Sequence, residues 1–103
     1  MDIRAFRLVT GEDLVAEVVE DGGATGGMWK VNNPVQLAMV PSREDPTKPT
    51  YGFVPYPAYS DEKTLEFHAS KVVFVVVPAR EFTQQYDRLF GAGLILPSSK
   101  LVS

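Results

Sequence analysis

Residues 72–77 constrain the fold of this chain more than any other segment. All six residues favour extended backbone, and five of them are valines. A strand with apolar side chains on both faces is usually covered on both faces. Because the chain has 103 residues and room for one domain, the second cover must come from a closed barrel or from another subunit. We therefore predict a strand that is shielded on both sides and that Pro78 ends.

Four segments upstream of this run also predict strands. Two of them flank Gly11, which can adopt the positive φ of a tight hairpin turn. The other two alternate apolar and polar side chains, as half-buried strands do. Closing short strands into a barrel hides edges that would otherwise invite aggregation, so we expect a mainly β, five-stranded barrel over about residues 3–77. The four segments are residues 3–10, 13–20, 30–40 and 64–70.

One further segment, residues 51–59, is extended and aromatic. Pro55 and Pro57 have no backbone N–H to donate, which keeps this segment out of the centre of a sheet. Residues 41–50 hold three prolines and mixed charges, a composition typical of a surface loop.

A short helix is predicted at about residues 79–90. Glu81 lies in its first turn, Arg88 in its last turn and Gly91 just past its end, which are the preferences of helix termini. Residues 91–103 form an apolar and then polar tail, and we expect residues 1–103 to form a single domain. The apolar positions at helical spacing are Phe82, Tyr86, Leu89 and Phe90.

The composition excludes several classes of function. The absence of cysteine excludes disulfide frameworks, thiol catalysis and cysteine-based zinc sites. The chain begins without a basic and then apolar segment and has no apolar run of membrane-spanning length, so we expect a cytoplasmic protein without a signal peptide or membrane contact. The net charge of −3 confines any nucleic-acid binding to a local patch, a pore or a surface repeated by symmetry.

The sequence does not predict an enzyme. His68 is the single histidine, and no Gly-x-Ser-x-Gly turn accompanies the serines. A lone histidine in a strand is more often exposed or hydrogen-bonded than catalytic. The acidic residues are scattered, so we expect neither a metal site nor a cofactor.

Two local features have a structural and a functional interpretation. The glycines of residues 22–27 could suggest a phosphate-binding loop, but a strand follows them instead of a helix, so a flexible connection is favoured. A group of aromatic residues suits core or interface packing, or a platform on which bases stack. It consists of Trp29, Tyr51, Phe53, Tyr56 and Tyr59. Trp29 beside Lys30 is the best candidate for stacking, because a flat ring next to a cation can serve a base and its phosphate.

Residues 8–18 resemble the first motif of the Sm and Sm-like proteins, which are five-stranded barrels that form RNA-binding rings. The segment has a Leu-x-x-Gly turn followed by alternating apolar residues, with Ala16 in place of the usual glycine. Asn32 or Asn33, ahead of a strand, resembles the asparagine of that family, although no aspartate stands just upstream.

Residues 67–75 are similar to the second motif of the same family. His68 stands where the base-contacting arginine would be, and Ala69 stands where the glycine would be. The resemblance covers about residues 3–77. It does not account for the C-terminal helix, since typical members carry a helix before the first strand. The whole chain also looks like the small Sm-like proteins of marine cyanophages, which would make it viral and place it in the cytoplasm of an infected bacterium.

The resemblance implies an SH3-like barrel that forms a homo-oligomeric ring of roughly five to seven subunits. The last strand of one subunit would pair with an edge strand of the next, and single-stranded RNA or DNA would contact loops at the pore. Asn33 or Asn32 would bind a base edge, His68 would stack on the base or donate to it, and Lys30 and Lys71 would supply positive charge. The alternative is a ring-shaped scaffold that binds proteins and no nucleic acid, which the acidic net charge supports.

Overall fold

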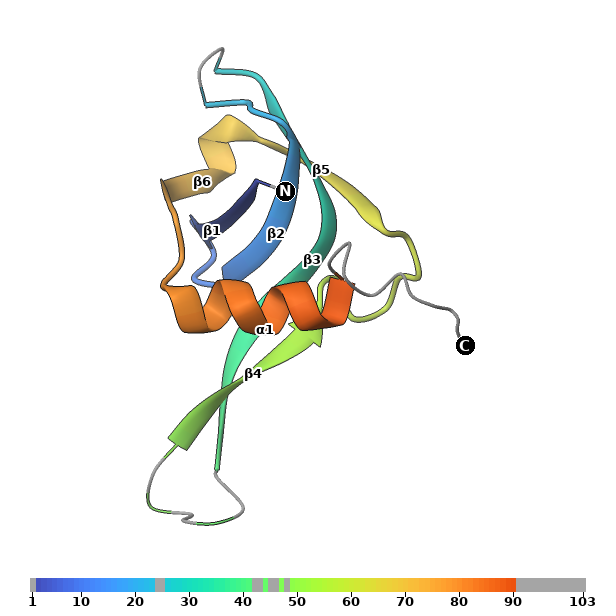
Figure 1. The fold of residues 1–103 in the computed structure, drawn as a ribbon. Coiled ribbons are helices and arrows are strands. Elements are labelled where there is room, and N and C mark those ends of the chain that lie inside the picture. The colour runs from blue at the N-terminus through green and yellow to red at the C-terminus, as the bar shows by residue number, and fades with distance from the viewer. Residues whose placement is uncertain (1, 24–25, 42–43, 45–46, 48, 91–103) are drawn as a thin grey trace.

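The computed structural model describes residues 2–23, 26–41, 44, 47 and 49–90. Within them the chain is mainly β, with one α-helix near the C-terminal end (Figure 1), as the sequence predicted. The elements are β1 (Ile3–Leu8), β2 (Asp13–Glu20), β3 (Met28–Pro41), β4 (Pro49–Pro55), β5 (Thr64–His68), a 3-10 turn (Ala69–Lys71), β6 (Val72–Val76) and α1 (Arg80–Phe90).

The described strands form one antiparallel sheet in the order β4-β3-β2-β1-β6, and β5 also pairs with β3. The number of strands differs from the prediction, because the sheet has six strands and not five. The additional strand is β4, which the prolines at its ends do not prevent from pairing, since it lies at an edge of the sheet. The strand order ends at β4 and β6, so the predicted closure into a barrel is not confirmed.

The strand β3 pairs with β2 along one edge and with two strands in turn along the other edge. Its first half pairs with β5, from Met28 opposite His68 to Asn32 opposite Thr64. Its second half pairs with β4, beginning with Val35 opposite Pro55. Asn33 lies between the two halves with a positive φ of 48°, a conformation that asparagine tolerates better than most residues. In Figure 1 the end of β3 and the start of β4 form a ribbon that extends away from the rest of the sheet.

Each face of the sheet carries its own apolar cluster. On one face the rings of Trp29 and Phe67 meet Phe6 edge to face, with centroids 5.0 and 5.4 Å from the Phe6 centroid. On the other face α1 inserts Tyr86 against Val15 and Val35. Both clusters follow from the alternation of side chains along β1, β2 and β3. The buried members of the first cluster are Phe6, Leu8, Leu14, Ala16, Trp29 and Val31.

The valine-rich strand is not covered on both faces by its own chain. Val75 packs against the first cluster, but Phe74 is 46% exposed and Val76 is 48% exposed. The reason is the position of β6, which pairs only with β1, while α1 packs on Val15 and Val35 in the middle of the sheet. The chain itself therefore does not supply the predicted second cover of this strand, and the alternative, a cover from another subunit, stays a prediction.

The hydroxyl group of Tyr86 joins α1 to two strands. It lies 2.9 and 3.0 Å from the carbonyl oxygens of Asn32 and Asn33, to which it donates, and it accepts the N–H of Glu17 at 3.1 Å. These backbone groups lie where the pairing of β2 with β3 shifts register and where β3 bends. The side chain is fully buried, and this burial raises the pKa of Tyr86 far above its usual range.

Replacing Tyr86 by phenylalanine should destabilise the fold. The change leaves the ring in place but leaves the buried N–H of Glu17 and the carbonyl groups of β3 without their partner. We expect the free energy of unfolding to fall by about 1–3 kcal/mol in urea titrations. Tyr59→Phe is the matched control, because Tyr59 is 92% exposed and its hydroxyl group stays in water. Equal effects of the two changes would contradict this role of Tyr86.

Alkaline pH should weaken the same interaction. The pKa of Tyr86 is raised in the folded state above the ordinary value of 10.0. The contribution of its neutral hydroxyl group is therefore fully present below that pH and is lost as the pH rises above it. We expect the difference in unfolding free energy between the wild type and Tyr86→Phe to shrink as urea titrations move from neutral to strongly alkaline pH. A difference that stays constant would contradict the shift.

Candidate functional site

The candidate residues from the sequence lie mainly on β3 and β5. Lys30 pairs with Glu66 and Asn32 with Thr64 across these two strands. Because side chains alternate along a strand, Lys30 and Asn32 point away from the cluster that buries Trp29. The β3–β5 pair therefore separates the candidates onto opposite faces of the sheet.

Trp29 is a core residue, so its predicted role as an exposed stacking platform is wrong. Its side chain is 3% exposed and packs edge to face on Phe6. The loop before it explains the burial: a Cβ atom on Gly22 would lie 2.6 Å from the backbone of Met28, and one on Gly23 would lie 3.0 Å from the Trp29 ring. The first glycines after β2 therefore let the chain pass close over the indole, and the segment connects two strands, as expected.

Lys30 and Asn32 are engaged by neighbours on their own sheet. The ammonium group of Lys30 lies 4.0 Å from the carboxylate of Glu20 and also faces Glu66 across the strand pair. The side-chain oxygen of Asn32 accepts the Thr64 hydroxyl group at 2.9 Å. A cation between two carboxylates offers little net positive charge to a phosphate.

Asn33 acts through its backbone. Its N–H donates to the carbonyl oxygen of Lys63 at 2.6 Å, and its own carbonyl oxygen accepts from Tyr86. The residue lies at the bend of β3 and lines a pocket together with Asp61 and Glu62. Two carboxylates and one lysine, Lys63, are part of its lining, a balance of charge that does not favour nucleic acid.

His68 and Lys71 are the candidates that share an exposed turn. The Nδ1 atom of His68 accepts the N–H of Ser70 at 3.0 Å and lies 2.9 Å from the Ser70 hydroxyl oxygen, so the ring caps the 3-10 turn. Ala69 donates its N–H to Gly27 at 2.8 Å, which holds this turn beside the connection between β2 and β3. Among the described residues no carboxylate bonds the His68 ring, so the contact with Ser70 does not form a triad.

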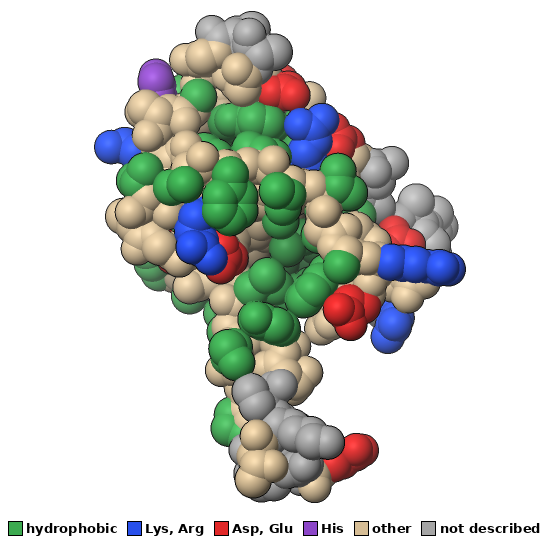
Figure 2. All heavy atoms as spheres, turned by 90° about the vertical axis from the view of Figure 1, so that its left-hand side faces the viewer, with side chains coloured by type: hydrophobic (Ala, Val, Ile, Leu, Met, Phe, Trp, Pro, Cys, Tyr) green, Lys and Arg blue, Asp and Glu red, His purple; other side chains and the backbone are tan. Residues whose placement is uncertain are grey.

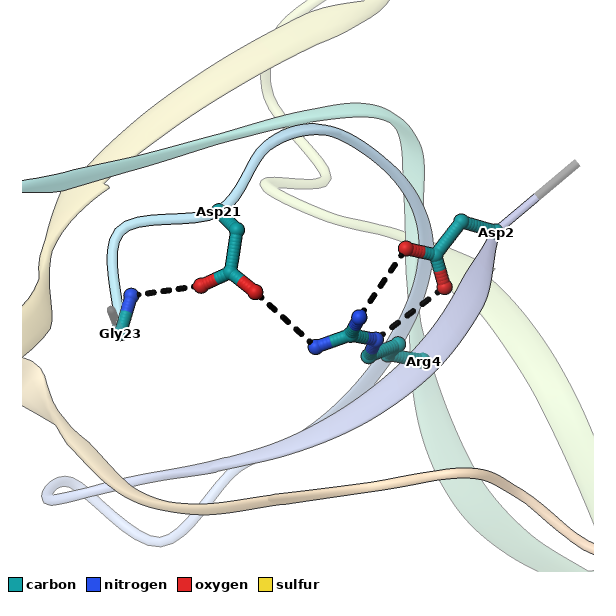
Figure 3. A network of polar contacts seen from close by, with 4 residues as sticks. All are labelled: Asp2, Arg4, Asp21 and Gly23. Carbon is teal, nitrogen blue, oxygen red and sulfur yellow. Dashed lines mark hydrogen bonds and ion pairs between the residues drawn. The ribbon is translucent and has the colours of Figure 1, made fainter. Parts of the chain in front are cut away.

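Arg4 forms a charged network that the sequence analysis missed (Figure 3). Its guanidinium group donates to the carboxylate of Asp2 at 3.1 Å and to that of Asp21 at 3.3 Å. Asp21 in turn accepts the N–H of Gly23 at 2.8 Å. The guanidinium carbon also lies 5.9 Å from the centre of the Trp29 ring. The network ties the start of β1 to the loop over Trp29, and its two carboxylates leave the arginine unavailable to an anionic ligand.

The exposed apolar side chains gather around β6. Figure 2 shows hydrophobic side chains over the side of the molecule that carries this strand. We call this the β6 surface and define it by Val73, Phe74, Val76 and Val77, which are 46–77% exposed. The ribbon formed by β3 and β4 carries a second exposed group, which consists of Met39, Val40, Tyr51 and Val54.

A pocket of about 280 Å³ lies between three segments that are distant in the sequence. Leu8 ends β1 and is followed by Val9 and Thr10, Tyr56, Pro57 and Tyr59 follow β4, and Leu65 and Phe67 belong to β5. Lys71 is the only charged residue in its lining. The sequence does not predict this pocket, because no motif joins the segments that line it.

Two further properties concern the described part of the chain. No three acidic or histidine side chains in it come together in a way that could hold a metal ion. Its helix is too short and too polar to cross a membrane.

Comparison with known proteins does not assign a family. No protein-family model matches the chain, and no curated protein matches it in sequence. The function must therefore be argued from the surfaces described above.

Trp29 is the only tryptophan, which allows its burial to be tested by fluorescence. We expect blue-shifted emission that moves to the red on unfolding in urea, because the ring leaves an apolar core for water. Adding a single-stranded oligonucleotide at low salt should leave the emission unchanged. Saturable quenching by the oligonucleotide would contradict the core position and restore the stacking role.

Proposed function

We propose that this protein is a self-associating module that assembles head to tail through the edges of β6 and β4 and serves as a protein-binding scaffold. The observation that carries the proposal is the exposed, apolar edge strand β6. An edge strand presents unpaired N–H and C=O groups that can pair with another chain.

The composition of β6 favours such pairing. Natural proteins protect free edges with charged residues, prolines or bulges. The five residues of β6 include no charge and no proline, and its side chains form the β6 surface. The one irregularity is a register shift between Arg7 and Leu8 of β1, opposite the start of β6. Burying these side chains against a second chain would recover about 25 cal/mol for each Å² of apolar surface removed from water.

The second edge of the sheet supplies a different partner surface. The strand β4 ends the sheet opposite to β6 and exposes Tyr51 and Val54. Joining two different surfaces of identical chains gives a head-to-tail contact, which closes into a ring when the rotation between neighbours allows it. The resemblance to Sm-like proteins agrees with this arrangement, because it implies pairing of the last strand with an edge strand of the next subunit.

A protein ligand is better supported than nucleic acid. The net charge of −3 is repeated in every copy of an assembly. Lys30 lies beside Glu20 and faces Glu66, and Trp29 is buried. Counterion release, which drives nucleic-acid binding, needs clustered Lys and Arg that these residues do not provide.

Blocking β6 should dissociate the assembly. Val76→Lys places a charge on the β6 surface, and Val19→Lys is its matched control, because both valines are 48% exposed and β2 is paired on both sides. In light scattering we expect the wild type and Val19→Lys at a multiple of the chain mass of 11.3 kDa. Val76→Lys should move towards that single-chain mass. A wild type that stays monomeric at micromolar concentration would overturn the proposal.

A mixing experiment tests the head-to-tail arrangement. Val54→Lys should block the β4 edge. Val54→Lys alone and Val76→Lys alone should therefore both be monomeric. A mixture of Val76→Lys and Val54→Lys retains one intact pair of surfaces and should form a dimer that does not grow further. If β6 paired with β6 instead, Val54→Lys alone would be dimeric and mixing would create no new species.

A further inference from the structure

The pocket between the turn after β1 and the segment after β4 has an apolar floor. Leu8 is 8% exposed and belongs to the first cluster, and Leu65 and Phe67 pack against that cluster from β5. The volume of about 280 Å³ lies just below the range of roughly 300–1,000 Å³ that is usual for small-molecule sites. The pocket therefore suits one or two amino-acid side chains better than a whole cofactor.

Two tyrosines form the rim of the pocket. The hydroxyl group of Tyr56 donates to the carboxylate of Glu12 at 3.2 Å, and Glu12 also accepts the hydroxyl group of Thr10. These contacts hold Tyr56 in place and lower the pKa of Glu12, with the Thr10 hydrogen bond as the largest cause. Tyr59 is 92% exposed while lining the pocket. An exposed ring beside an apolar floor can cover a side chain that enters.

The charge of the pocket lining indicates which polar group a ligand should carry. Lys71 is its one charged residue, and among the described residues no carboxylate forms an ion pair with it. The carboxylate of Glu12 is engaged by two hydroxyl groups. A ligand that brings its own carboxylate next to an apolar group would therefore complement both the floor and the cation.

We infer that this pocket binds a peptide segment in which an apolar side chain is followed directly by a carboxylate. The inference rests on the proposed function, because it names the kind of partner that the scaffold holds. A peptide is favoured over an oligonucleotide because one lysine can pair with one carboxylate, whereas the net charge of −3 of the chain opposes the binding of many phosphates.

The test is an NMR titration of the ¹⁵N-labelled full chain with a short peptide blocked at both ends. The peptide carries one leucine followed by one aspartate among glycines and serines, and its companions carry asparagine or lysine in place of the aspartate. We expect the aspartate peptide to shift the amide resonances of Val9, Tyr59 and Lys71. The asparagine peptide should bind about two- to fivefold more weakly, as for an exposed ion pair.

Charge reversal provides the decisive comparison. Lys71→Glu should weaken the binding of the aspartate peptide at least as much as replacing the aspartate of the peptide by asparagine does. The Lys71→Glu variant should bind the lysine peptide instead. Lys30→Glu alters the net charge equally but lies outside the pocket lining, so it should bind the aspartate peptide as the wild type does. Equal affinities for the three peptides, or no shifts at the pocket, would overturn the inference.

Two further arms identify other occupants. A single-stranded oligonucleotide that shifts the pocket resonances more strongly than the peptide would overturn the inference in favour of nucleic acid. Pocket resonances of Val76→Lys that shift with protein concentration in the absence of peptide would overturn it in favour of a second copy. Repeating the titration with Val76→Lys separates the two proposals. If the wild type is monomeric and still binds the peptide, only the proposed assembly is refuted. If the wild type assembles and does not bind the peptide, only the proposed peptide site is refuted.

Discussion

The hydroxyl group of Tyr86 holds the bend of β3, and the arrangement of the sheet depends on that bend. One buried oxygen accepts the N–H of Glu17 on β2 and donates to the backbone of β3 at Asn32 and Asn33. Buried backbone groups at a break in strand pairing need such a partner, since water cannot reach them. On either side of the bend β3 pairs first with β5 and then with β4. The helix thus stabilises the point at which a single strand changes its neighbour.

This arrangement leaves the two ends of the sheet with different surfaces. The end at β6 is short and wholly apolar, whereas the end at β4 lies on a ribbon that leaves the body of the molecule. A sheet with two unlike open edges offers two different surfaces for the head-to-tail contact proposed above. The proposed peptide pocket is built from the turn after β1 and from the β4–β5 connection, so neither edge is needed to form it.

Local patterns predicted much of the fold. The hairpin of β1 and β2, the alternation of Leu14, Val15 and Ala16 and the helix near the end of the chain all follow from periodicity. Periodicity does not indicate what covers a strand. The valine run therefore predicted a shielded strand, but not whether the same chain or another subunit shields it. The sequence left Trp29 open between core packing and base stacking, because its burial depends on glycines that let a loop pass over the ring. The pocket was missed because its walls meet only in three dimensions.

The prolines of β4 have a consequence for any strand that adds to its free edge. Pro49 and Pro55 stand at its two ends, and proline has no N–H for a ladder. Successive N–H groups of a strand point to opposite edges, and one edge of β4 is already paired with β3. Only two or three of the five residues between the prolines can therefore donate to an incoming strand, and the prolines at both ends limit how far such a strand could extend its pairing along β4.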